Sequence, residues 1–414
     1  MKRNSFRAAG RFFAAAAVML FAALVLAQSA SAVTEKVLCS LTGPAGPDGN
    51  GPHSGLIFDD VGNLYGTTWS GGLYGHGSFY KCGPNPDGTW SETILHSFNG
   101  SDGDQSDWGR LTFDSAGNLY GVTAGGGKHG VGVLFKFTPN PDGTWTETIL
   151  HHFTGGKDGS WPRTTIYIDA QGTLYGAASY GGSKGCGTLY KMAPGSNRVI
   201  HQFMDSPACS PWVGLIPDAG GNLYGTTRNT VNGCSKPPNE CGTVFKMTPS
   251  PDGKWSFQVI HRFKGGNDGS DPSVSGLIFD DAGNLYGTTE HGGAHGSGVF
   301  FTLMPGPNGK WTYQVLHDFD WTSDGAAAIG SLVRDPAGNI YGSAANGGEY
   351  GFGTVYEMTP NPDGTWTFSV VYAFTGSDGI YPLGNLNIDA AGNLYGVTGA
   401  GGAYGAGTVF EITP

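Results

Sequence analysis

The stretch Gly-Asn-Leu-Tyr-Gly-Thr-Thr at residues 62–68 decides the fold of this chain, because close copies of it recur along the sequence. Seven glycines open the pentapeptide Gly-Asn-Leu-Tyr-Gly or a one-residue variant of it: Gly62, Gly117, Gly172, Gly221, Gly283, Gly338 and Gly392. Successive copies are 55, 55, 49, 62, 55 and 54 residues apart. Such long repeats are typical of solenoids and propellers, in which each repeat is one supersecondary unit.

Each repeat contains four segments with the pattern of β-strands. Examples of the four, in chain order within a repeat, are residues 55–59, 63–68, 242–248 and 145–153. β-branched and aromatic residues dominate these segments, and apolar and polar residues alternate in the third and fourth. Turn sequences follow the first segment (Asp-x-x-Gly-Asn) and the third (Pro-Asn-Pro-Asp-Gly). Each repeat is therefore predicted to form a four-stranded antiparallel sheet.

The two ends of the sequence predict a closed ring. Residues 34–42 contain a lone segment of the fourth type, whereas the chain ends after a segment of the third type at residues 407–413. Pairing the two would complete a seventh sheet and leave no unpaired edge. We therefore predict an all-β fold, a seven-bladed β-propeller over residues 33–414 that is closed by its N-terminal strand. An open solenoid is the alternative, and it would leave both ends uncapped.

The first 32 residues have the three parts of a secretory signal peptide. Four basic residues precede an apolar run at residues 12–26, and Ala30-Ser31-Ala32 matches a cleavage site. An uncleaved anchor is the alternative, although the run is short for a membrane span. We expect an exported monomer, periplasmic or extracellular, with no membrane insertion after cleavage.

The net charge and the cysteine content indicate which partners and which compartment to expect for this protein. Cleavage would change the formal net charge from −11 to −15, because it removes four basic and no acidic residues. So acidic a chain is not expected to bind nucleic acid. All six cysteines follow the signal, where disulfides are permitted. We expect Cys234 to pair with Cys241 and Cys186 with Cys209, while Cys39 and Cys82 offer no geometric argument for pairing.

The composite motif resembles a known family of tandem repeats. Gly-Asn-Leu-Tyr-Gly-Thr-Thr is followed by Gly-Gly-x-x-Gly-x-Gly-Thr-Val-Phe and then Leu-His-x-Phe-x-Gly-x-Asp-Gly. This combination is similar to the Gloeo/Verruco repeat of exported bacterial proteins, over about residues 33–414. The resemblance implies a secreted or surface-displayed repeat protein and transfers no activity. The first two strands also resemble the repeat of NHL-type propellers in architecture.

Two sets of tryptophan are distinguished by position. Five open the fourth strand and are expected to be structural: Trp90, Trp145, Trp255, Trp311 and Trp366. Six other aromatic residues fall in the longer loops, all on one rim of the predicted ring: Trp69, Trp108, Trp161, Trp212, Trp321 and Tyr381. Exposed aromatic faces beside Asp and Asn can bind sugar rings, so these six are candidate ligand contacts. The alternative is that they pack over the Gly-rich loops.

Charged candidates are fewer. Arg110 opens the first strand of the second repeat, and Arg163 lies just ahead of the first strand of the third. If first strands are innermost, both could bind an anion near the mouth of the central channel; the alternative is a solvated surface arginine. An Asp-Gly step recurs in the loops between repeats, which makes five carboxylates weak Ca²⁺ candidates against ordinary turn chemistry: Asp102, Asp158, Asp268, Asp324 and Asp378. No other cofactor is expected. The fourth-strand histidines are expected to form local hydrogen bonds, because the outermost strands splay apart.

The sequence predicts a non-catalytic binding or scaffold module, with carbohydrate or cell-envelope material as ligand. No group of residues with a catalytic arrangement is found, so no catalytic residue is predicted. One alternative is an extracellular propeller enzyme, such as a Ca²⁺-assisted lactonase or polysaccharide lyase. Another is a purely structural surface protein.

Overall fold

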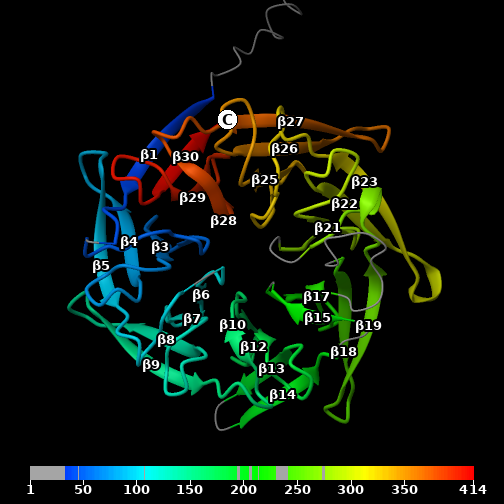
Figure 1. The fold of residues 1–414 in the computed structure, drawn as a ribbon, viewed down its shortest axis with the longest axis horizontal. Helices are drawn as coiled ribbons and strands as arrows, with labels where there is room; N and C mark the ends of the chain where they lie inside the picture. Colours follow the sequence, from blue (N-terminus) through cyan, green and yellow to red (C-terminus); the bar gives the residue numbers. More distant parts are fainter. Residues whose placement is uncertain are drawn as a thin grey trace, which may run out of the picture.

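The computed structural model describes residues 33–44, 46–106, 108–193, 196–204, 208–212, 214–229, 241–272 and 276–414. These residues form seven antiparallel sheets arranged as blades around a central axis (Figure 1). The predicted seven-bladed propeller is confirmed, and the open solenoid is not observed. The predicted signal peptide, residues 1–32, lies outside the described residues. No helix in the described part of the chain is long and apolar enough for a membrane span.

Every blade runs from an innermost strand at the axis to an outermost strand at the perimeter. Blade one contains β2 (Ile57–Phe58), β3 (Leu64–Thr67), β4 (Ser78–Pro84) and β5 (Trp90–Ser97). Blade two contains β6 (Thr112–Phe113), β7 (Leu119–Thr123), β8 (Val133–Pro139) and β9 (Trp145–His152). Blade three contains β10 (Ser160–Pro162), β11 (Tyr167–Ile168), β12 (Leu174–Tyr180), β13 (Thr188–Ala193) and β14 (Ser196–Gln202).

The remaining blades repeat this order. Blade four contains β15 (Cys209–Pro211), β16 (Ile216–Pro217), β17 (Leu223–Asn229), β18 (Thr243–Pro249) and β19 (Trp255–Arg262). Blade five contains β20 (Ile278–Phe279), β21 (Leu285–Thr288), β22 (Val299–Pro305) and β23 (Trp311–Asp318). Blade six contains β24 (Val333–Arg334), β25 (Ile340–Ala344), β26 (Thr354–Pro360) and β27 (Trp366–Ala373). Blade seven contains β28 (Ile380–Ile388), β29 (Leu394–Ala400), β30 (Thr408–Thr413) and, from the other end of the chain, β1 (Thr34–Ser40).

The ring closes where β1 pairs antiparallel with β30, with Thr34 opposite Thr413 and Ser40 opposite Thr408. In Figure 1 the two ends of the colour scale meet at this pair. A disulfide between Cys39 and Cys82 then ties β1 to β4 of blade one. Sequence reasoning left this pair open, and it covalently joins the seventh blade to the first.

A second disulfide also crosses between blades. Cys186, in a loop of blade three, is bonded to Cys209 in blade four, as predicted. Cys241 is disulfide-bonded, and its expected partner Cys234 lies outside the described residues. Such bonds persist in oxidising compartments, which indicates an exported protein.

The repeated pentapeptide builds the tight hairpin between the first two strands. In blade one the Asp59 carboxylate accepts hydrogen bonds from the Asn63 backbone N–H (2.8 Å), the Asn63 side-chain amide (2.7 Å) and the Tyr65 hydroxyl (3.1 Å). Gly62 has a φ of 90°, which favours glycine. A Cβ on Gly66 would lie 2.6 Å from the hydroxyl of Tyr80. The motif is therefore structural, since its residues are used in turn formation and packing.

The innermost strand of blade one is shorter than predicted. Residues 55–59 were expected to be extended, but β2 spans only Ile57–Phe58. The reason is that the Ser54 side chain, in place of a backbone group, forms the hydrogen bonds to the backbone of Thr67. The hydroxyl of Ser54 donates to the Thr67 carbonyl and accepts from the Thr67 N–H, both at 3.2 Å.

The hydrophobic core is divided into seven clusters, each lying between two neighbouring blades. The cluster between blades seven and one contains Leu38 of β1, Leu64 of β3 and Val409 of β30. Its residues come from both ends of the chain. Blade-to-blade contact thus buries the faces that a single four-stranded sheet would leave in water.

Candidate functional site

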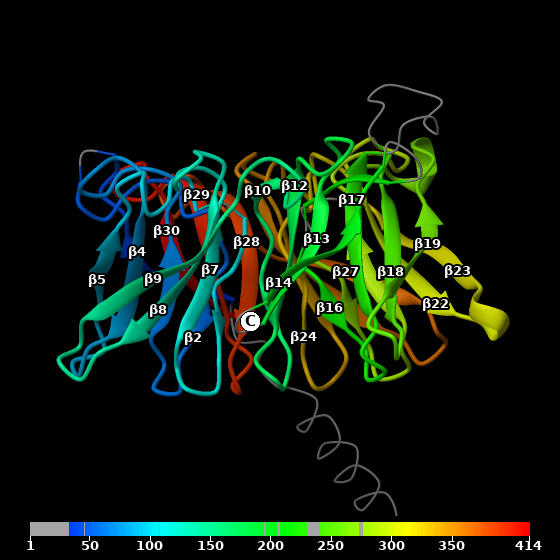
Figure 2. The same ribbon diagram turned by 90° about the horizontal axis from the view of Figure 1, so that it is seen from below.

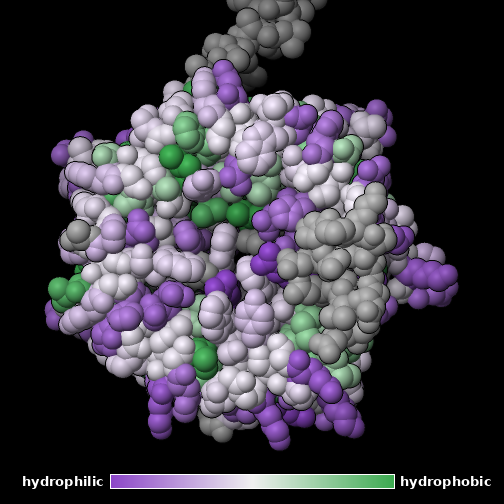
Figure 3. All heavy atoms as spheres, viewed as in Figure 1, coloured by the Kyte–Doolittle hydropathy of each residue, from purple (hydrophilic) through white to green (hydrophobic). Residues whose placement is uncertain are grey.

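One rim of the ring carries the irregular part of the molecule. The loops between second and third strands, and those linking successive blades, emerge on this loop rim, while short hairpins form the opposite rim (Figure 2). The loop rim faces the reader in Figure 3 and is hollowed at its centre. Because binding residues concentrate on variable loops held by a rigid scaffold, this rim is the candidate ligand-binding face.

Seven equivalent residues, one from each blade, line the loop rim in the left-handed backbone conformation. They have φ values between 53° and 64°, and are Gly51, Gln105, Trp161, Ser210, Asp271, Ala327 and Tyr381. Their equivalence is visible in their hydrogen bonds: Trp161 N–H donates to the Val131 carbonyl and Tyr381 N–H to the Phe352 carbonyl. Six of the seven are not glycine, and such a conformation is costly for other residues. We call this set the rim ring.

Blade three contributes an exposed aromatic pair to this rim. Trp161 of the rim ring and Tyr180 at the end of β12 are each 39% exposed, and their rings meet edge to face at 5.9 Å. The register of the sheet brings them together, since Ser160 pairs with Tyr180. The guanidinium of Arg163 lies 4.7 Å from the Trp161 ring.

A second indole continues this arrangement into blade four. Arg163 also lies 5.1 Å from the ring of Trp212, and Arg228 lies 4.5 Å from the same ring. Arg228 forms an ion pair at 3.0 Å with Asp271 of the rim ring, whose side chain is fully buried. The two guanidinium groups therefore hold the indoles in place by cation–π attraction. We call Trp161, Arg163, Tyr180 and Trp212 the aromatic patch.

The other predicted rim aromatics fall into two groups. Trp69 and Trp108 are partly buried on either side of His53, at ring distances of 5.3 and 5.7 Å, so they pack over the loops. Trp321 and Tyr381 are 53% and 46% exposed. Neither of these two rings stacks on the other or on Trp161 among the described residues. The structure thus brings Trp161 and Trp212 together through Arg163 but does not join all six candidates into one surface.

Arg110 lies in the central channel. A cavity of about 180 Å³ there is lined by Arg110 and by residues in or just before the first strands of blades three to seven, including Thr165, Ser331 and Asn385. The Arg110 guanidinium contacts the side-chain oxygen of Asn387 at 3.5 Å, while its Nε has no hydrogen-bond partner among the described residues. Burial lowers the pKa of this guanidinium. No described carboxylate forms an ion pair with it, so the channel wall presents a positive charge.

The five Asp-Gly carboxylates do not converge on a common cation site. Each one lies in its own loop between blades, and three of them contact the fourth-strand histidine that precedes that loop: His96–Asp102 (3.2 Å), His151–Asp158 (3.0 Å) and His317–Asp324 (2.9 Å). The fourth, Asp268, lies 3.5 Å from His261, and the fifth, Asp378, accepts a hydrogen bond from Tyr372 at 2.7 Å. Backbone N–H groups also donate to these carboxylates, as Asn99 N–H does to Asp102. His96, His151 and His317 form the local hydrogen bonds that were expected, whereas Nε2 of His261 has no hydrogen-bond partner among the described residues.

Two clusters have enough ligand atoms close together for a cation, in the part of the chain that the structure describes. They are His96, Asp102 and Glu147 in one place, and Asp271, Glu290 and His291 in the other. In the first cluster, burial raises the pKa of Glu147 to about 7, against the opposing charge of His96. A carboxyl group that keeps its proton is a poor metal ligand.

Tyr180 was missed by sequence reasoning. Comparison of the repeats could have identified it, because Tyr180 is aromatic while the residues at the equivalent position of other blades are small or polar, such as Ser70, Gly125 and Asn346. Only the register showed that this position lies beside the rim ring.

Seven antiparallel blades, a channel that contains a buried arginine and an aromatic loop rim define a β-propeller with a candidate ligand-binding face. The chain belongs to the Gloeobacter/Verrucomicrobia repeat family, whose model matches residues 26–236 and 230–414. A search of the curated proteins finds no match.

Solved structures are similar in fold. The extracellular domain of a one-component system from B. thetaiotaomicron is 12% identical with a TM-score of 0.55, and the match covers 92% of this chain and 40% of that chain. A gluconolactonase from Xanthomonas campestris is 17% identical with a TM-score of 0.38, covering 69% of this chain and 82% of that chain.

Proposed function

We propose that this protein is an exported, non-catalytic binding propeller whose aromatic patch binds carbohydrate of the cell envelope or its surroundings. The observation that carries the proposal is the exposed Trp161–Tyr180 pair, in which Trp161 has a left-handed backbone and its ring lies against Arg163. An indole face takes the apolar face of a sugar ring, and the phenol hydroxyl of Tyr180 can bond with its hydroxyl groups.

The rigidity of the patch supports this function. Trp161 is held in an unfavourable backbone conformation, and such strain is concentrated at binding sites in other proteins. The neighbouring indole of Trp212 contacts the guanidinium groups of both Arg163 and Arg228. A ring that is already ordered loses little conformational freedom when a ligand arrives, which favours binding.

The channel supplies a second contact for an anionic sugar. The mouth of the channel lies at the centre of the loop rim (Figure 3), and Arg110 has no described carboxylate partner. We propose that Arg110 receives a carboxylate or phosphate group of the same ligand, since guanidinium binds both in a bidentate manner.

A glycan array probed with the mature protein tests the proposal. Trp161→Ala is expected to weaken binding at least ~10-fold, because it loses an aromatic contact worth more than about 1.4 kcal/mol. Trp212→Ala is expected to weaken binding as well, because it removes the indole against which Arg163 is held. Trp321→Ala is the matched control, since this exposed rim tryptophan lies outside the patch. Arg110→Met should weaken binding of acidic glycans more than of neutral ones. Binding that survives both patch substitutions, or no glycan binding by the folded protein, would reject the proposal.

A further inference from the structure

The tryptophan that opens the outermost strand fills a defined place between blades. In four blades its ring lies 5.4–6.0 Å from the second-strand tyrosine of the preceding blade: Tyr65–Trp145, Tyr175–Trp255, Tyr224–Trp311 and Tyr286–Trp366. Trp90 packs against the cluster that contains Tyr395. The gap between neighbouring blades, near the hairpin rim, is thus shaped for an indole.

Blade three has no tryptophan for this place. In blade two Trp145 directly precedes Thr146, which pairs with Thr138. In blade three the matching pair is Ala193 with Ser196, and the residue before Ser196 in the sequence is a glycine. The short step of 49 residues after Gly172 reflects this shorter hairpin.

The tyrosine that would receive the missing indole is left uncovered. Six of the seven equivalent tyrosines are buried, with exposures of 3–8%, whereas Tyr120 of blade two is only partly buried. Leu150 of the neighbouring β9 is 37% exposed. Both observations place the vacancy between blades two and three.

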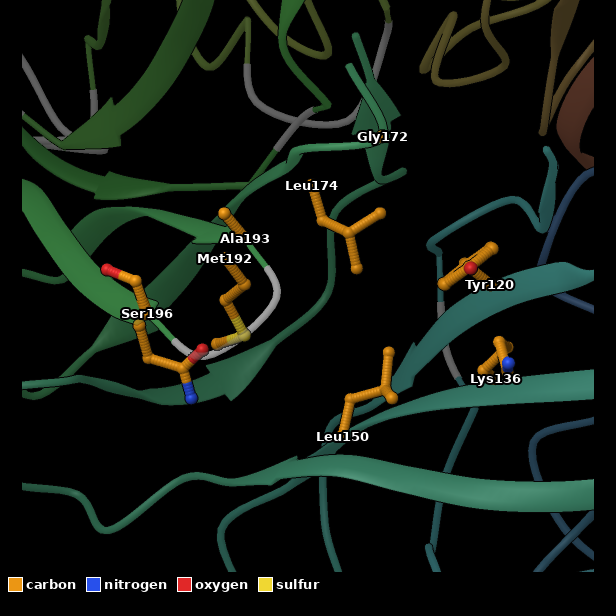
Figure 4. Close-up of a pocket in the computed structure, with 9 residues that line it drawn as sticks. Tyr120, Lys136, Leu150, Gly172, Leu174, Met192, Ala193 and Ser196 are labelled. Atoms are coloured by element: carbon orange, nitrogen blue, oxygen red, sulfur yellow. The ribbon is translucent and has the colours of Figure 1, made fainter. Parts of the chain in front are cut away.

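A cavity of about 460 Å³ occupies this place. Tyr120, Lys136 and Leu150 of blade two face Leu174 and Met192 of blade three across it (Figure 4). Its walls are apolar, and the side chains of Lys136, Ser196 and Asn197 supply polar groups. The volume is within the range of sites for small organic ligands, and the mixture of groups is typical of them.

We propose that this cavity is a binding site for a small planar aromatic molecule of the indole type. Five of the equivalent gaps between other blades show what the walls accept, because each of these five holds an indole supplied by the chain itself. The ammonium group of Lys136 favours a ligand that carries a carboxylate. This interblade site lies toward the hairpin rim, away from the aromatic patch, so it is independent of the proposed carbohydrate site.

Isothermal titration calorimetry with indole and with indole-3-acetate tests the proposal. Both should bind the mature protein with a dissociation constant in the ~10 µM to ~1 mM range expected for so small a ligand. Lys136→Met should weaken indole-3-acetate several-fold and leave indole unchanged. No heat of binding for either compound would overturn the proposal.

Grafting the blade-two hairpin provides a variant that fills the cavity. Residues 194–195 are replaced by the sequence of residues 139–145, which restores a tryptophan in the place that the register requires. The graft should abolish indole binding and raise the melting temperature. The same graft with alanine at its last position is the control and should still bind. Unchanged binding by the tryptophan graft would show that indole binds elsewhere.

Discussion

At the scale of single residues, the rim ring shows how a repeat fold carries variable chemistry. All seven positions have the same left-handed backbone, yet their side chains range from none at Gly51 to indole at Trp161. The backbone there is set by the loop hydrogen bonds rather than by the residue. Side chains can therefore vary at this ring without changing the fold, at some cost in stability for every residue other than glycine.

Ala327→Gly is expected to stabilise the protein by about 0.5–1 kcal/mol. Ala327 has a φ of 53°, and glycine adopts this conformation without the steric penalty of a Cβ, although it also gains entropy in the unfolded chain. Urea denaturation of the mature protein measures the change. Ala328→Gly, at the next and ordinary backbone position, is the control and should destabilise the protein by about 1 kcal/mol. A loss of stability in Ala327→Gly would contradict the strain assigned to the rim ring.

At the scale of elements, the outermost strands are joined from blade to blade by a repeated contact. The fourth-strand histidine of one blade meets a residue of the next blade's outermost strand. This residue is aromatic in the second half of the ring, where His317 stacks on Phe368 at 3.9 Å and His261 on Tyr313 at 4.0 Å. It is Glu147 in blade two, 3.3 Å from His96. The same position thus uses stacking in some blades and a carboxyl group in others.

His201 shows the consequence of losing the loop aspartate. Its loop contains no Asp-Gly step, and the ring stacks on Phe257 at 4.3 Å, as the rings of His261 and His317 stack on the next blades. Burial lowers the pKa of His201 to about 4, so this imidazole stays neutral in the folded protein. The unfolded chain takes up a proton below the ordinary pKa of about 6.5. This residue therefore lowers stability as the pH falls from 6.5 toward 4.

Glu147→Gln is expected to stabilise the protein at pH 8 and to leave its stability unchanged near pH 4. Burial raises the pKa of Glu147 from 4.5 to about 7, so the folded protein keeps a proton that the unfolded chain releases. Stability is consequently lost as the pH rises from 4.5 through 7. The gain at pH 8 should be on the order of 1–3 kcal/mol, measured by urea denaturation at the two pH values. An exposed control is Glu349→Gln, and a loss of stability in Glu147→Gln at pH 8 would oppose this account.

At the scale of the whole molecule, the closure of the ring was predictable from the sequence. The propeller repeat gives two signals there, a recurring motif and a nearly constant spacing between its copies. The segment at residues 34–42, which has the pattern of a fourth strand, pairs as β1 with β30 of the last blade. The site was less predictable. Tyr180 and the Cys39–Cys82 bond depend on register and on contacts between distant segments, which no local pattern reveals.

Disruption of the closing disulfide is expected to lower stability. The bond spans 43 residues between strands of blades seven and one, and the chain-entropy relation gives roughly 4 kcal/mol for a loop of this length. Replacing both Cys39 and Cys82 by serine should therefore reduce the free energy of unfolding by about 2–4 kcal/mol. β1 would still pair with β30, so the ring would remain closed while the variant is folded.

Disulfide mapping of the exported protein tests the closure of the ring most directly. Digestion of non-reduced protein followed by mass spectrometry should yield one linked pair of peptides that contains Cys39 and Cys82, in stoichiometric amount. This bond is expected when β1 lies in blade seven, against blade one. Cys39 linked to a cysteine other than Cys82 would contradict the closed seven-bladed ring.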